Sequence, residues 1–308
     1  MRIHWATTTI VAIGAAVCAL TGALASESND GRWTMQPSER PGMVQFSLQS
    51  SRAHGFMNIS DWPTKDFSGL DLAQDTQFTL TRDAGRFEFG GTLRDSAGAG
   101  SFKFIPDARY AQEMKTLGFN VAEGNQIHFA VHDVSLSFAR DMKNANPQGL
   151  DADKLMAFRI HGVSRKFIDD LRSAGLNERD SDQLVAFRIH NVTPELVQSV
   201  RSAGYTPDSE SLVAMRIHGA TPEYMDALKK RGYNDVPMDQ LIAFRIHGVT
   251  PDFIGEVQKL GFEHPRPQEL VDMRIHGVTP QYIAELQGRG VKNLTIDKLV
   301  AMKIHGID

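Results

Sequence analysis

Hydrophobic residues recur in one repeating arrangement from about residue 106 to residue 308. The clearest copies end in an apolar residue, a basic residue, isoleucine and histidine, at 158–161, 187–190, 215–218, 244–247, 273–276 and 302–305. Successive histidines in these endings are 29, 28, 29, 29 and 29 residues apart. A fixed period in this range is typical of stacked repeats. The pattern therefore predicts a repeat array rather than a single closed core.

The first half of each repeat predicts a short helix, here called helix A. After a Ser or Thr that can cap the helix, apolar residues follow at i, i+1 and i+4, as in Phe167, Ile168 and Leu171, which predicts one buried stripe. The cap column holds Ser135, Ser164, Thr193, Thr221, Thr250 and Thr279. Residues that tolerate positive φ close helix A at Gly118, Asn146, Gly175, Gly204, Gly232, Gly261 and Gly290.

The second half of each repeat predicts helix B. It begins near Asp151, Asp180, Asp208 or Thr295, and it ends at Asp133, Gly162, Asn191, Gly219, Gly248, Gly277 and Gly306. These caps predict an α-solenoid of about seven short helix pairs with a period of 28–29 residues, the first two pairs being degenerate. Helices of about ten residues are marginal alone, so each pair must be held by its neighbours.

A basic column lies inside helix B, at Arg159, Arg188, Arg216, Arg245 and Arg274, with Lys303 in the last copy. At about 100° per residue, Arg188 falls between Leu184 and Val185. We therefore expect a half-buried column whose carboxylate or carbonyl partners join one repeat to the next. The alternative is a ladder of guanidinium groups that faces an anionic ligand.

A histidine column ends helix B, at His161, His190, His218, His247, His276 and His305. A metal requires ligand nitrogens about 2 Å from one ion, whereas stacked helices lie roughly 8–10 Å apart. Equivalent histidines of successive repeats therefore cannot share an ion without rearrangement. We expect each imidazole to cap the free carbonyls of its helix end, and metal binding remains the alternative.

Residues 33–105 predict a small β-rich domain, so the fold class is α+β. Apolar and polar residues alternate at 43–48, 77–81 and 86–89, with a hairpin turn at 83–85. A further strand pair is expected at 92–93 and 101–104, across a glycine-rich turn at 96–100. The expected architecture is an antiparallel sheet or sandwich.

This domain also holds the candidates for acid/base chemistry, although nothing in the sequence fixes their distances. They are His54, Asp61, Asp66, Asp71 and Asp75. We expect Trp33, Trp62 and Phe56 to form its core rather than an aromatic contact patch. No zinc-binding His-Glu-x-x-His, paired Cys-x-x-Cys or EF-hand spacing occurs in the chain, so we assign no catalytic, metal or cofactor residue and expect no cofactor.

The first 25 residues predict a secretory signal peptide, because Arg2 precedes an uncharged apolar stretch that ends in Ala23-Leu24-Ala25. Residues 26–32 would then be a linker. Cleavage after Ala25 would remove the only cysteine, Cys18, and leave no stable membrane span. We therefore expect a periplasmic or secreted protein.

Charge adds little to this picture. The formal net charge is −4, and acidic and basic residues are mixed, so the chain has no electrostatic footprint for nucleic acid. The expected partner is a protein or a peptide.

The repeated block at 241–253, Leu-Ile-Ala-Phe-Arg-Ile-His-Gly-Val-Thr-Pro-Asp-Phe, and the upstream segment 87–119 carry a resemblance. They resemble repeats of uncharacterised secreted bacterial proteins and of the C-terminal regions of some BlaR-type membrane metallopeptidases, the antirepressor sensor family. The resemblance covers nearly all of the mature chain. It carries over no catalytic site, because the chain lacks the zinc motif and the membrane helices of those peptidases. It implies a bacterial extracytoplasmic module on the sensing side of envelope signalling.

Two hypotheses about function follow. The first is a non-enzymatic binding or scaffold protein that uses the helical repeat surface for protein–protein interaction. The second is a metal-handling protein or a hydrolase, with a site in the β-domain loops or on the histidine column.

Overall fold

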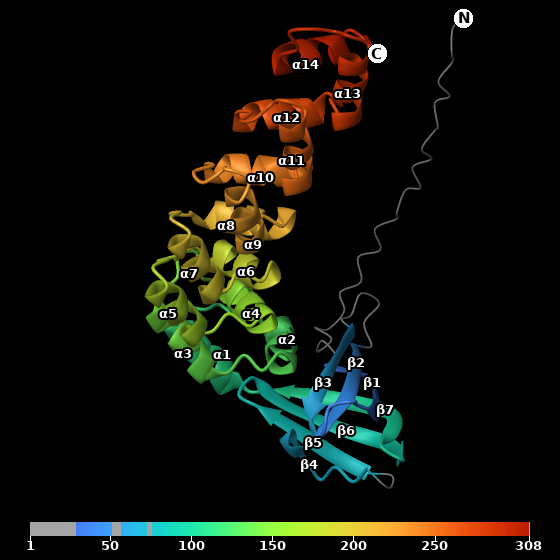
Figure 1. Cartoon of the computed structure of the whole chain (residues 1–308). Helices are drawn as coiled ribbons and strands as arrows, with labels where there is room; N and C mark the ends of the chain where they lie inside the picture. The colour runs from blue at the N-terminus through green and yellow to red at the C-terminus, as the bar shows by residue number, and fades with distance from the viewer. Residues whose placement is uncertain (1–28, 51–56, 73–75, 308) are drawn as a thin grey trace, which may run out of the picture. The chain divides into compact units, whose positions relative to one another are not determined.

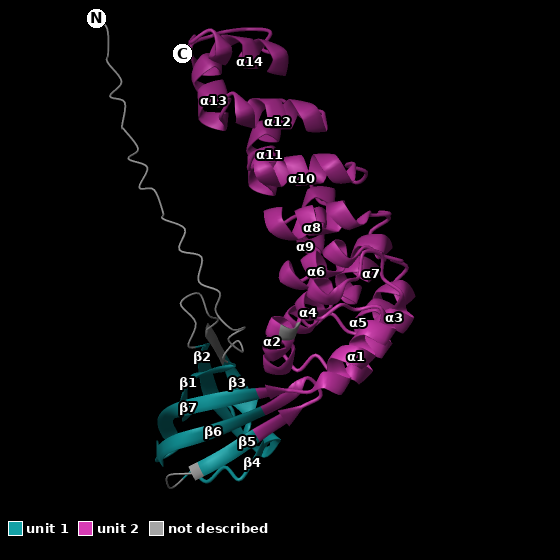
Figure 2. Ribbon diagram, turned by 180° about the vertical axis from the view of Figure 1, so that it is seen from behind, with its two compact units in different colours: residues 1–79, 87–104 teal, residues 80–86, 105–308 magenta. Residues whose placement is uncertain are grey.

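The computed structural model describes residues 29–50, 57–72 and 76–307 (Figure 1). The expected signal peptide, His54, Phe56 and Asp75 lie outside these ranges. A β-sheet in the N-terminal region precedes a series of helices, which confirms the α+β class. The chain divides into two compact units (Figure 2): one holds the described residues up to Thr79 together with 87–104, and the other holds 80–86 and 105–307.

One antiparallel sheet contains all the strands of the described part of the chain. They are β1 (Asp30–Pro37), β2 (Met43–Ser50), β3 (Met57–Pro63), β4 (Phe67–Ser68), β5 (Thr76–Arg82), β6 (Gly85–Arg94) and β7 (Ala97–Pro106). Their order across the sheet is β3-β2-β1-β7-β6-β5-β4. The first strand lies between β2 and β7, where Trp33 pairs with Leu48 on one side and with Gly100 on the other.

Aromatic side chains form the core of the sheet unit. Trp33 stacks on Phe46 with ring centroids 5.6 Å apart, and Phe78 stacks on Phe89 at 4.8 Å. Trp33 is 1% exposed and Trp62 is 5% exposed. Both tryptophans are therefore core residues, as the sequence predicted.

The expected glycine-rich turn at 96–100 is wrong. The chain turns at Asp95 and Ser96, which both have positive φ, and Gly98 and Gly100 already belong to β7. A Cβ on Gly100 would collide with the carbonyl of Gly90 and with the indole of Trp33. Gly100 therefore makes room for the tryptophan, whose Nε1 donates a hydrogen bond to Gly90 O at 3.2 Å.

Seven helix pairs fill residues 105–307. The A helices are α1 (Ala108–Leu117), α3 (Leu136–Ala145), α5 (Arg165–Ser173), α7 (Pro194–Ser202), α9 (Pro222–Lys229), α11 (Pro251–Lys259) and α13 (Pro280–Gly288). The B helices are α2 (Gln126–Val131), α4 (Ala152–His161), α6 (Ser181–Ile189), α8 (Ser209–His218), α10 (Met238–Ile246), α12 (Pro267–Ile275) and α14 (Ile296–Ile304). The B helices from α4 to α14 each contact the next B helix, so the pairs form a stack.

The helix ends follow the predicted caps. Each Ser or Thr of the A-helix cap column accepts a hydrogen bond from the amide three residues later. Asp151, Asp180, Asp208 and Thr295 do the same for B helices. Every residue of the two predicted closing columns has positive φ. The local sequence therefore determines where most of these helices begin and where they end.

The tip of the β5–β6 hairpin belongs to the helical unit. Gln126 of α2, 2% exposed, donates from Nε2 to Ala84 O at 2.7 Å and to Asp107 O at 2.6 Å. Asp83 accepts a hydrogen bond from the Leu136 amide at 2.8 Å, at the start of α3. Polar contacts, one of them fully buried, thus join the hairpin tip to the first helix pairs.

Candidate functional site

A row of exposed isoleucines marks the C-terminal ends of the B helices. Their side chains are 51–58% exposed, although large aliphatic side chains are usually buried. This isoleucine row consists of Ile160, Ile189, Ile217, Ile246, Ile275 and Ile304. Among the described residues, the other exposed large hydrophobic side chains are Val291 and Ile307.

The arginine column beside this row is exposed, so the prediction of a half-buried column is wrong. The buried residues of α6 include Leu184 and Phe187, which define a narrow stripe. At about 100° per residue, Ile189 lies nearly opposite that stripe and Arg188 lies at its edge. The apolar residue types of Val185 and Ile189 suggest a wide buried arc that includes the arginine. Both residues face away from the observed stripe, and Val185 is partly exposed.

Each arginine of the column binds the main chain of the preceding repeat. The Nε–O distances are 3.1–3.2 Å, and the acceptor is the carbonyl of the residue that ends the preceding helix B. The donor and acceptor pairs are Arg159 and His132, Arg188 and His161, Arg216 and His190, Arg245 and His218, and Arg274 and His247. Carbonyls at a helix C-terminus have no partner within the helix, so the arginines satisfy groups that would otherwise need water.

The same arginines stack on aromatic rings of the preceding helix A. The guanidinium carbon lies 5.7 Å from the centroid of Phe138 for Arg159, and 5.0 Å from Phe167 for Arg188. The distances are 4.8 Å for Arg245 on Tyr224 and 5.1 Å for Arg274 on Phe253, and Lys303 Nζ lies 3.9 Å from Tyr282. The equivalent position below Arg216 is Leu196. A carbonyl and a ring together hold most of these guanidinium groups in one orientation.

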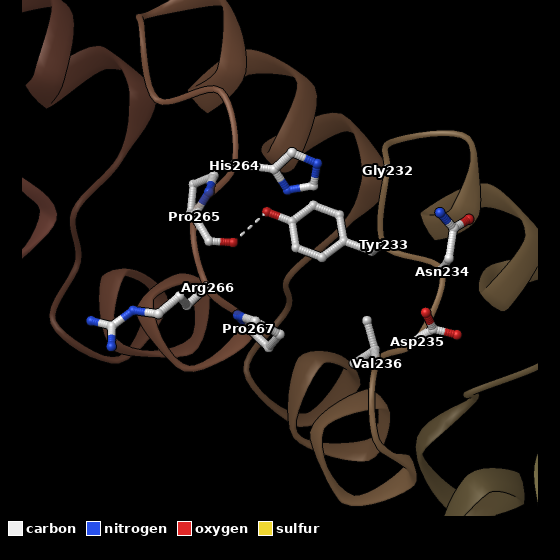
Figure 3. A pocket seen from close by; sticks show the side chains of 9 residues that line it. All are labelled: Gly232, Tyr233, Asn234, Asp235, Val236, His264, Pro265, Arg266 and Pro267. Atoms are coloured by element: carbon white, nitrogen blue, oxygen red, sulfur yellow. Dashed lines mark hydrogen bonds between the residues drawn. The ribbon is translucent and has the colours of Figure 1, made fainter.

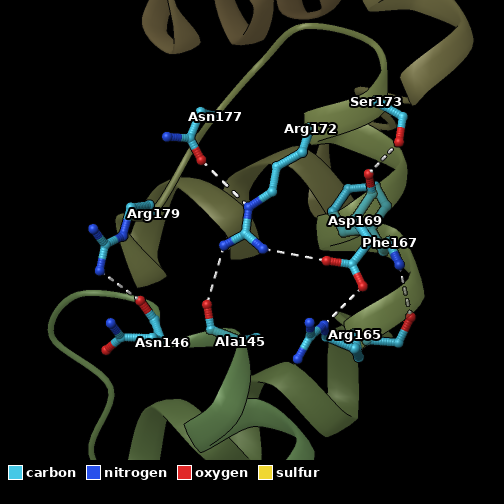
Figure 4. A network of polar contacts seen from close by, with 10 residues as sticks. Ala145, Asn146, Arg165, Phe167, Asp169, Arg172, Ser173, Asn177 and Arg179 are labelled. Atoms are coloured by element: carbon cyan, nitrogen blue, oxygen red, sulfur yellow. Dashed lines mark hydrogen bonds and ion pairs between the residues drawn. The ribbon is translucent and has the colours of Figure 1, made fainter.

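A second set of contacts joins successive A helices, and the sequence reasoning missed it. Figure 4 shows Arg172 of α5, which donates to Ala145 O at the end of α3 at 3.1 Å and to Asp169 Oδ1 at 3.2 Å. The equivalent side chains of other repeats also donate to carbonyls at the end of the preceding helix A: Lys143 to Leu117, Arg201 to Gly175, Gln258 to Arg231 and Gln287 to Leu260. The sequence pattern that indicates these contacts is a long side chain with a hydrogen-bond donor, eight residues after the Ser or Thr that caps helix A.

Four residues of the histidine column, His161, His190, His218 and His247, accept the hydrogen bonds of the arginine column with their main-chain carbonyls. Among the described residues, no group of three or more His, Cys, Asp or Glu side chains could hold a metal ion. His132, which ends α2, is partly buried, and this burial together with the nearby His128 lowers its pKa.

In the part of the chain that the structure covers, no helix has the length and apolar character needed to cross a membrane.

The isoleucine row and the arginine column together form one surface, here called the helix-B edge. The positive charges of this surface are unevenly compensated. Arg159 forms an ion pair with Asp133 at 2.7 Å. Arg188, Arg216, Arg245 and Arg274 form no ion pair or further hydrogen bond with any residue that the structure describes. The edge therefore presents isoleucine side chains next to positive charges whose Nη groups are available to a ligand.

A shallow pocket of about 360 Å³ lies between the linker from α9 to α10 and the linker from α11 to α12 (Figure 3). Two of its polar side chains are bound within the protein: Tyr233 donates to Pro265 O at 2.7 Å, and Arg266 pairs with Glu269 at 2.8 Å. Burial raises the pKa of Tyr233 to about 12, so this phenol stays protonated at neutral pH. The pocket is a weaker candidate than the helix-B edge.

The loop carboxylates of the sheet unit lie on separate segments. Asp61 is in β3 and forms an ion pair with Arg40 at 3.6 Å. Asp66 ends the short 3-10 helix Thr64–Asp66, and Asp71 follows β4. The arrangement offers no observation that favours acid/base chemistry over solvation at these positions.

No family model, no curated protein and no solved structure matches the chain. The resemblance to BlaR-type repeats therefore stays a prediction from the repeated block.

Proposed function

We propose that this chain is a non-enzymatic binding or scaffold protein whose helical array holds a protein partner along the helix-B edge. The observation that supports this most strongly is the isoleucine row. Single exposed aliphatic residues are common on protein surfaces. Six at equivalent positions of successive repeats form a regular row of exposed apolar side chains, and exposed apolar features typically mark interaction sites.

The energetics favour binding of this kind. Full burial of an isoleucine side chain is worth about 1.5–3 kcal/mol, and about half of each side chain in the row remains to be buried. Several such contacts offset the loss of rotational and translational freedom on association. The array supplies them without rearrangement, because stacked neighbours hold each helix in place.

We further propose that the protein acts outside the cytoplasm, in the bacterial envelope or after secretion. The signal-peptide pattern of residues 1–25 and the resemblance to BlaR-type repeats support this location. Both also support a role on the sensing side of envelope signalling.

Site-specific photocrosslinking in cells that express the full chain tests this function. A photoreactive residue at Ile246 in the row should capture one discrete protein, and the same residue at exposed Glu256 on α11 should not. Introducing Ile217→Thr and Ile275→Thr beside the probe should abolish the capture, because these changes remove neighbouring apolar contacts. Equal capture from both positions, or no capture from Ile246, would contradict the proposal.

A further inference from the structure

We infer that the helix-B edge binds an extended, acidic segment of its partner that carries an aliphatic side chain at every third residue. This inference rests on the proposed function and specifies the chemistry of the partner. Three features of the edge carry it: the order of its side chains, its charge and its repeat spacing.

Isoleucines and arginines alternate along the edge. Arg188 Nε lies 3.1 Å from the carbonyl of His161, the residue that follows Ile160. Arg188 is itself followed by Ile189. Each guanidinium group is therefore held at the end of the preceding helix B, beside the carbonyl of the residue that follows that repeat's isoleucine, and its own arginine is followed by the next isoleucine. A chain that runs along the stack meets an aliphatic group and then a cation, once per repeat.

The charge selects an acidic segment. The Nη groups of Arg188, Arg216, Arg245 and Arg274 form no hydrogen bond or ion pair with a described residue, while Nε donates to a carbonyl. A guanidinium group whose orientation is already fixed loses little freedom when it binds a carboxylate. Carboxylates between the aliphatic residues of the partner would complement the four positive charges.

The spacing selects an extended segment. Stacked helices lie roughly 8–10 Å apart, and a polyproline II chain advances about 9.3 Å in each three-residue turn. Its every third side chain therefore meets successive isoleucines from one face. Six isoleucines cover five repeat steps, which corresponds to a segment of about 15 residues. In a helical partner, residues seven apart are separated by about 10.5 Å, so that partner would lose register along the row.

Fluorescence anisotropy with the full chain tests this inference, using the labelled peptide (Leu-Glu-Pro)5 as the probe. We expect saturable binding that weakens as salt is raised. The double variant Ile217→Thr with Ile246→Thr should bind about tenfold more weakly, because two aliphatic contacts are lost. Val291→Thr, which changes an exposed valine outside the row, is the matched control and should leave the affinity unchanged.

Three further peptides test register and charge. The period-four peptide (Leu-Glu-Pro-Pro)4, the basic peptide (Leu-Lys-Pro)5 and an acidic helical peptide with leucine every seven residues should each bind at least about tenfold more weakly. Equal or tighter binding of any one of them would overturn the inference. So would the absence of (Leu-Glu-Pro)5 binding, or a dimer in light scattering that the double variant abolishes, since a second copy would then occupy the row.

The two proposals can fail separately. Row-dependent crosslinking in cells without binding of (Leu-Glu-Pro)5 would overturn the extended acidic segment and leave the binding function standing. Failure of both experiments would overturn both proposals.

Discussion

Single side chains in this array bind carbonyls that the helix ends leave open. The arginines of the B helices and the long donors of the A helices each reach back one repeat. Helix C-termini carry partial negative charge, so cationic donors suit these positions. A contact of this kind joins two repeats without burying a charge, which is less costly than the half-buried column expected from the sequence.

Replacing these arginines should cost stability in proportion to their contacts. Arg245→Met removes the hydrogen bond to His218 O and the stacking on Tyr224, whereas Arg216→Met removes only a hydrogen bond to His190 O. We expect Arg216→Met to lower the free energy of unfolding by about 1 kcal/mol. Arg245→Met should cost about 0.5–1 kcal/mol more. Urea unfolding of the two variants measures the difference, and equal losses would contradict a contribution from the ring.

The titration of His132 should make stability depend on pH. Burial lowers its pKa below the ordinary value of 6.5, so the unfolded chain takes up the proton before the folded chain does. The free energy of unfolding should therefore fall as the pH drops through about 6.5, and this loss should stop below the folded-state pKa. His132→Asn should reduce the pH dependence between pH 7.5 and 5 in thermal unfolding. An unchanged pH dependence in His132→Asn would contradict a contribution from this imidazole.

At the level of elements, the sequence predicts helix boundaries better than it predicts which face is exposed. Caps are local: the Thr250 hydroxyl binds an amide three residues later, and no other part of the chain is needed. Burial depends on neighbouring helices. Ile189 looks like a core residue by type, yet it lies opposite the stripe that packs against the stack. Gly98 is a second case in which residue type misleads, because glycine is common in turns. In the structure Gly98 lies in β7, and a Cβ there would meet the side chain of Leu93.

A cavity in the middle of the stack should affect more than its own helix. Leu241 of α10 is 1% exposed, and α10 contacts both α8 and α12. Leu241→Ala should lower the free energy of unfolding by about 2–5 kcal/mol. It should also speed amide hydrogen exchange in α8 and α12, because short helices depend on their neighbours.

Leu299→Ala in α14 is the matched control for this cavity. Leu299 is equally buried, but α14 is the last B helix of the described stack and packs against α12. Faster exchange should therefore stay within the C-terminal pairs. If Leu241→Ala left exchange in α8 and α12 unchanged, the helices would not be coupled through the stack.

At the scale of the whole molecule, the division into units does not follow chain order. Residues 80–86 lie between segments of the sheet unit, yet they cluster with the helices. The sequence placed the hairpin turn at 83–85 correctly but contained no sign of this association, because Gln126 and Ala84 are 42 residues apart. Non-local contacts of this kind depend on how elements pack and have no local signature.

Gln126→Met tests whether this contact stabilises the start of the array. Methionine matches glutamine in length but cannot donate, so Ala84 O and Asp107 O each lose one hydrogen bond and keep only a backbone amide donor. We expect a loss of about 1 kcal/mol and faster hydrogen exchange at 80–86, α1 and α2. Gln287→Met, which removes one exposed hydrogen bond to Leu260 O, should have a smaller effect confined to the C-terminal pairs. The effect stays there because stacked repeats transmit a disturbance only to their neighbours. Unchanged exchange at 80–86 in Gln126→Met would mean that the hairpin tip does not depend on this contact.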